Sequence, residues 1–69
     1  MDIIPQSETM SIWISRVWAD GRLVYGRQVY GDCVSYLLGI YATEKRAREI
    51  KSEISGLMIN DSYYEMPEK

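Results

Sequence analysis

The pair Asp20-Gly21 lies between two apolar, β-prone runs, and it limits the possible folds of this 69-residue chain more than any other feature. Both residue types tolerate a positive φ, and Asp-Gly between apolar runs is the strongest short-range signal for a β-hairpin. The run at 9–18 is rich in β-branched and aromatic residues, as strands prefer. The sequence therefore predicts that strands at 9–18 and 22–30 pair in antiparallel fashion.

A third strand is predicted at 33–42, after a second turn at Gly31-Asp32. Side chains alternate between the two faces of a strand. In the first strand this alternation places Ile12, Ile14 and Trp18 on one face and Trp13, Ser15 and Val17 on the other. In the third strand one face carries Val34, Tyr36, Leu38 and Ile40.

The tripeptide Val-Tyr-Gly occurs twice, at 24–26 and 29–31. A phosphate-binding loop needs Lys and Ser or Thr after its last glycine, but Asp32-Cys33 follows here. The repeat is therefore interpreted as a strand with a β-bulge at Gly26, which would bring both tyrosines to one face. The alternative is a shallow pocket lined by Tyr25, Arg27 and Tyr30.

The hydrophobic period changes from that of a strand to that of a helix at residue 43. Thr43 is a candidate N-cap, Gly56 is a candidate C-terminal stop, and the segment 43–56 is predicted to be a helix. Its apolar stripe consists of Ala47, Ile50, Ile54 and Leu57. Short edge strands are predicted at Ile3-Ile4, which Pro5 ends, and at 63–66.

These elements predict a single domain over 1–69 of the α+β class: an antiparallel β-meander of three to five strands with one α-helix packed on one face. A single narrow helix leaves the other face of the sheet open, and exposed apolar patches usually mark contact surfaces. We expect self-association, as a homodimer, because a domain this small has a thin core. The alternative is that the termini cover the open face. The expected interaction residues are Trp13, Val17, Tyr25, Arg27 and Tyr30.

Composition excludes several classes of protein. The chain has no histidine, one cysteine and a net charge of −2. Without histidine there is no His-based catalytic triad and no histidine metal site, and Cys33 is expected to be a small buried thiol. We therefore expect no enzymatic activity and no cofactor. The acidic balance disfavours direct nucleic-acid binding, no apolar run is long enough to span a membrane, and the lone thiol suggests the cytoplasm.

A cluster of cations on the predicted helix allows a second hypothesis. Lys45, Arg46 and Arg48 lie close together in sequence, with arginines of the hairpin elsewhere in the chain. If a dimer brought these groups together, they could bind a small anionic nucleotide between aromatic walls. The alternative is an ordinary solvated helix face.

Two stretches, LGIYATEKRAREI at 38–50 and YYEMPEK at 63–69, resemble a group of small uncharacterised proteins carried by phages and prophages of Gram-positive bacteria. The matching positions are Gln6-Ser7, Gly39-Ile40-Tyr41, Thr43-Glu44 with Ala47, and residues 64–68. Glu8 stands where the group has glycine, and the central hairpin has no match. The resemblance implies a strand–helix–strand order and a phage-type origin, and it implies no active-site residue.

Taken together, these observations suggest a cytoplasmic, non-enzymatic phage-type protein that binds a host protein, such as a defence nuclease, and occludes it as anti-CRISPR proteins do. The alternative is an oligomeric sponge that sequesters a small anionic nucleotide signal. A minor structural or regulatory component is a third possibility.

Overall fold

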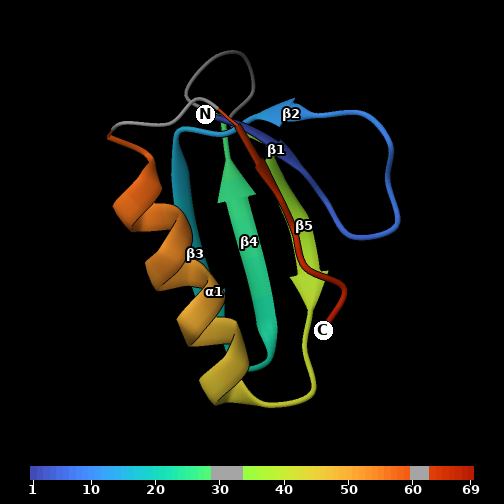
Figure 1. Ribbon diagram of the computed structural model, residues 1–69, viewed down its shortest axis with the longest axis vertical. Coiled ribbons are helices and arrows are strands. Elements are labelled where there is room, and N and C mark those ends of the chain that lie inside the picture. The colour runs from blue at the N-terminus through green and yellow to red at the C-terminus, as the bar shows by residue number, and fades with distance from the viewer. Residues whose placement is uncertain (29–33, 60–62) are drawn as a thin grey trace.

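The strands form two three-stranded sheets in the computed structural model, which describes residues 1–28, 34–59 and 63–69. The first sheet is an antiparallel meander of β3 (Arg16–Asp20), β4 (Leu23–Arg27) and β5 (Ser35–Ile40). The second has the order β2-β1-β6, where β1 (Asp2–Ile4) pairs antiparallel with β2 (Ile12–Trp13) and parallel with β6 (Tyr63–Glu65). With helix α1 (Glu44–Leu57), this confirms the predicted α+β class and its meander (Figure 1).

The predicted hairpin is present, with its turn shifted by one residue. Asp20 pairs with Leu23, so the two central residues are Gly21 and Arg22. Gly21 has a φ of 60° and Arg22 has no positive φ. A positive φ at only the first central position is the pattern of a type II′ turn, whose twist suits paired strands.

The predicted strand at 9–18 is two strands, because the chain changes sheets between Ile14 and Ser15. The amide of Ile14 donates to the carbonyl of Met1 (2.8 Å), whereas the amide of Ser15 donates to the carbonyl of Arg27 (2.9 Å). The bend interrupts the alternation: Ile14 is buried, and Val17, three residues later, packs against the core. Ile14 and Trp18 therefore do not share a face, as strict alternation had predicted.

The predicted β-bulge at Gly26 is wrong, since the irregularity lies on the neighbouring strand. Val24 pairs with Gly39 and Tyr25 pairs with Leu37, so Leu38 is the additional residue on β5. Gly26 pairs regularly with Val17 and Tyr36. The turn predicted at Gly31-Asp32, and the environment predicted for Cys33, lie outside the described residues.

Helix α1 begins as predicted and ends later. The Thr43 hydroxyl accepts a hydrogen bond from the Arg46 amide (3.1 Å), which confirms the N-cap. The predicted stop at Gly56 is wrong, because the helix continues to Leu57 and is capped by Met58, whose amide donates to Ile54 (3.0 Å). The buried residues of the helix are Ala47, Ile50 and Ile54.

The two ends of the chain complete the core. Met1, Ile3, Tyr64 and Met66 are buried in one cluster with residues of the meander and the helix. The second sheet therefore lies beside α1 over the same face of the meander, as Figure 1 shows for β1 and β6. β6 is an edge strand as predicted, whereas β1 is the central strand of its sheet, because β6 pairs with it on the side away from β2.

Candidate functional site: two outward sheet faces

The outer face of the meander carries three rows of side chains, because cross-strand partners point to the same side of a sheet. Arg16, Arg27 and Ser35 form one row, Trp18, Tyr25 and Leu37 form the middle row, and Asp20, Leu23 and Ile40 form the third. We call these nine residues the meander face. In the middle row the rings of Trp18 and Tyr25 stack, with centroids 5.7 Å apart and an interplanar angle of 18°.

The meander face is apolar at its centre and open to solvent. Leu37 and Ile40 are 46% and 51% exposed. Within the described part of the chain, α1 and the second sheet both pack on the opposite side, against Val24 and its neighbours. A pocket of about 300 Å³ lies at one end of the face, lined by Arg16, Val17, Trp18 and Arg27. The termini thus leave this face uncovered, in contrast to the alternative considered from the sequence.

A second aromatic surface lies on the outside of the other sheet. Asp2 pairs with Trp13 on β2 and with Tyr63 on β6, so the three side chains form one row. Ile3, the next residue of β1, is fully buried, so this row points away from the core. Trp13 is 48% exposed and Tyr63 is 54% exposed. We call Asp2, Trp13 and Tyr63 the terminal-sheet face.

The interaction residues predicted from the sequence do not gather on one surface. Tyr25 and Arg27 lie on the meander face, and Trp13 lies on the terminal-sheet face. Val17 packs against the core, and Tyr30 lies outside the described residues. The prediction missed Trp18 and Tyr63. The sheet change after Ile14 reverses the orientation that simple alternation assigns to Trp18, and the pairing of β6 with β1 has no local sequence signal.

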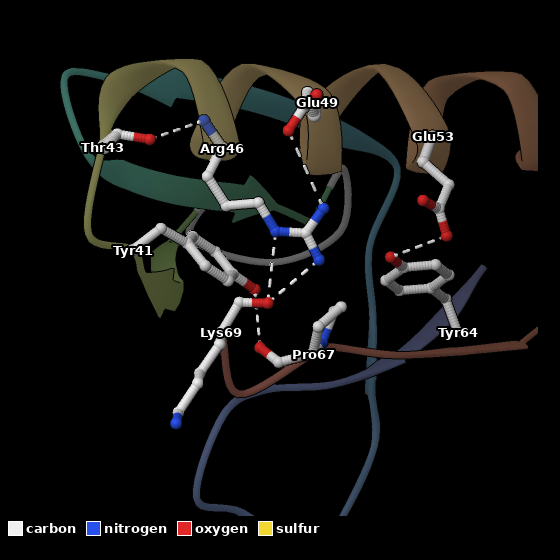
Figure 2. A network of polar contacts seen from close by, with 8 residues as sticks. All are labelled: Tyr41, Thr43, Arg46, Glu49, Glu53, Tyr64, Pro67 and Lys69. Carbon is white, nitrogen blue, oxygen red and sulfur yellow. Dashed lines mark hydrogen bonds and ion pairs between the residues drawn. The ribbon is translucent and has the colours of Figure 1, made fainter.

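Arg46, one of the three helix cations predicted to bind an anion, has other partners within the described chain. The Arg46 guanidinium donates from Nε and Nη2 to the carbonyl oxygen of Lys69, at 3.2 and 2.9 Å, and its Nη1 lies 3.9 Å from Glu49 Oε1 (Figure 2). Lys45 and Arg48 are exposed. Arg46 and Arg48 are two residues apart and thus about 200° apart around the helix. Arg46 holds the C-terminal segment instead.

Other side chains hold the same segment. The Gln6 amide nitrogen donates to the carbonyls of Pro67 (2.8 Å) and Glu68 (3.1 Å), while its oxygen accepts from the Ile40 amide (2.8 Å). The Tyr41 hydroxyl also donates to the Pro67 carbonyl, at 2.9 Å (Figure 2). Together with Arg46, these contacts fix residues 67–69 against the end of β5 and α1.

The two buried tyrosines act as neutral hydrogen-bond donors. Burial raises the pKa of Tyr41 above its usual value. Burial also raises the pKa of Tyr64 strongly, and the hydrogen bond to Glu53 (3.1 Å) and the charge of that carboxylate raise it further (Figure 2). A tyrosine whose pKa is raised in this way stays protonated near neutral pH. It therefore serves as a structural hydrogen-bond donor rather than as a general base.

Among the described residues, no group of three or more His, Cys, Asp or Glu side chains is placed to hold a metal ion. In the same ranges, no helix has the length and apolar character needed to cross a membrane. No family model, curated protein or solved structure matches the chain.

Proposed function

We propose that this chain works by binding another protein and that the terminal-sheet face makes the contact. In this proposal it is a non-enzymatic, phage-type inhibitor that occludes a host defence protein. The observation that carries the proposal is the row of Trp13, Asp2 and Tyr63, in which two half-exposed aromatic rings flank a carboxylate.

This row has the chemistry of an interface centre. Trp and Tyr are enriched among the residues that dominate binding energies, because they bury a large apolar area and lose few rotamers. Asp2 adds an acceptor between the rings, which favours a partner that presents a Lys, an Arg or a backbone amide there. The resemblance of 38–50 and 63–69 to phage proteins supports the phage-type origin in this proposal, and a host protein is then the proposed partner.

The experiment places a photo-crosslinking amino acid at position 13 and, as a matched control, at position 59. Ile59 is also apolar and is 86% exposed, but it follows α1. In Gram-positive bacterial cells we expect one protein adduct from position 13, absent from position 59 and lost when Tyr63→Glu is added. The same adducts from both positions, or an adduct that persists in Tyr63→Glu, would argue against the proposal.

A second candidate function is the capture of a small anionic nucleotide in the pocket at the end of the meander face. The favouring observation is that Arg16 pairs directly with Arg27 beside the Trp18 ring, around a volume of about 300 Å³. Guanidinium groups form charge-assisted hydrogen bonds to phosphate oxygens, and an aromatic ring beside them offers a stacking surface for a base. Mono- and dinucleotides should then raise the melting temperature, less so in Arg16→Gln than in the surface control Arg48→Gln. An equal response of both variants would exclude this site.

A further inference from the structure

The meander face has opposite charges at its two ends. Arg16 and Arg27 form the first row, and Asp20 belongs to the third row, on the other side of the apolar middle row. Arg16 and Asp20 are both exposed and lie on the same strand, β3. A strand rises roughly 3.3 Å per residue, so four residues separate these groups by about 13 Å. The two side chains are therefore too far apart to pair within one chain.

A two-fold axis along the middle row would bring these charges together between two copies. Such a rotation places one meander face on the other and reverses the strand direction, so that each strand lies over its own counterpart. Arg16 of one copy then lies over Asp20 of the other, and the symmetry forms this pair twice. Trp18 lies on β3 midway between the two charges, so it meets its own counterpart at the axis.

We propose that the meander face binds the meander face of a second copy of this chain, in an antiparallel two-fold dimer with Arg16 paired to Asp20 across the interface. The apolar side chains that this would remove from water are Trp18, Leu23, Tyr25, Leu37 and Ile40. An apolar centre with charges at its rim is the usual anatomy of an interface. The dimer leaves both terminal-sheet faces free, so it stands independently of the proposed protein contact at that face, but it would cover the pocket of the second candidate function.

Charges near the turn do not change this arrangement. Arg22 is exposed in the turn after Asp20. Glu44 lies on the helix side of the same turn, where its carboxylate would be 4.0 Å from a Cβ at Gly21. Neither residue belongs to the three rows, so Asp20 is the charge of the third row that can face Arg16.

Charge reversal tests the register of the proposed dimer. Analytical ultracentrifugation should show that the wild-type chain is a dimer, and that Arg16→Asp and Asp20→Arg each weaken the dimer by about tenfold or more, because every reversal creates two like-charge contacts. The double variant Arg16→Asp/Asp20→Arg should restore the wild-type affinity. An equimolar mixture of the two single variants should form a heterodimer, since both of its cross-interface pairs are again of opposite charge.

Two further variants keep the test decisive. Arg48→Asp makes the same charge change on an exposed helix position and should leave the dimer intact, whereas Leu37→Glu should abolish the dimer. Circular dichroism confirms that each variant is folded, which is expected because none of these side chains is in the core. A monomeric wild-type chain would overturn the proposal. So would a failure of both the equimolar mixture and the double variant to recover the wild-type affinity of the dimer.

Discussion

Ile14 lies directly over Gly26, so closely that a Cβ on Gly26 would be 2.8 Å from Ile14 Cγ2 and 2.9 Å from Leu38 Cδ1. Ile14 is the residue at which the chain passes from the second sheet to the meander, and Leu38 is the extra residue of β5. The absence of a side chain at Gly26 therefore lets the bend and the bulge pack into one core.

Replacing Gly26 with alanine should thus destabilise the protein. Overpacking a closed core costs typically about 1–3 kcal/mol in the free energy of unfolding. The matched control is Gly56→Ala, since a Cβ at this helical position meets no atom within 4 Å. There the gain in helix propensity should stabilise the chain by roughly 0.5–1 kcal/mol. Urea denaturation of both variants measures the sign of each change in the free energy of unfolding. Equal changes in the two variants would contradict the packing described.

Gln6 links the outer edge of β5 to the C-terminal segment. Gln6→Glu keeps the acceptor for the Ile40 amide but removes both donors to Pro67 and Glu68, and it places a negative charge against two carbonyl oxygens. We expect the free energy of unfolding to fall by about 1–3 kcal/mol in this variant. Hydrogen exchange should speed up at the Met66 amide, which bonds to Ile4, more than at the Ile40 amide. Glu8→Gln, a change in the same exposed loop, should leave both rates unchanged.

The buried Tyr64 hydroxyl should make the protein sensitive to alkali. An unfolded tyrosine ionises at a pH of about 10, whereas in the folded chain burial and Glu53 raise the pKa of Tyr64 strongly. Above pH 10 the unfolded state therefore holds fewer protons than the folded state, and the free energy of unfolding falls as the pH rises. The contribution of the protonated Tyr64 hydroxyl to the free energy of unfolding is complete below pH 10. It is lost as the pH approaches the pKa of Tyr64 in the folded chain.

Tyr64→Phe isolates this effect. The variant should lose about 1 kcal/mol at pH 7, because the hydrogen bond to Glu53 is gone, and its stability should fall less steeply above pH 10 than that of the wild type. Denaturation curves between pH 7 and 11 provide the measurement, with the exposed Tyr63→Phe as control. An unchanged slope in Tyr64→Phe would show that Tyr64 does not set the alkaline limit.

Local signals predicted much of the fold. The hairpin between β3 and β4, the cap at Thr43 and the stripe of Ala47, Ile50 and Ile54 all depend on residues close together in sequence. The structure contains all three, with the hairpin turn one residue later than predicted. The helix continues past Gly56 because that glycine does not adopt a positive φ, so nothing forces the chain to stop there.

The remaining features depend on contacts between distant residues. β6 pairs with β1 from the other end of the chain, and Gly26 is explained only by Ile14 and Leu38 above it. The same holds for the candidate surfaces. Alternation along β2 and β3 predicts the exposure of Trp13, but the bend at Ile14 decides that Trp18, rather than Val17, reaches the meander face.

Native mass spectrometry of the wild-type chain at micromolar concentration tests most directly whether the meander face is an interface between two copies. We expect a species of twice the 8.0 kDa chain mass with no added ligand. A monomer at that concentration would contradict it. So would a species a few hundred daltons heavier than a whole number of chains, which would instead point to a nucleotide in the Arg16 and Arg27 pocket.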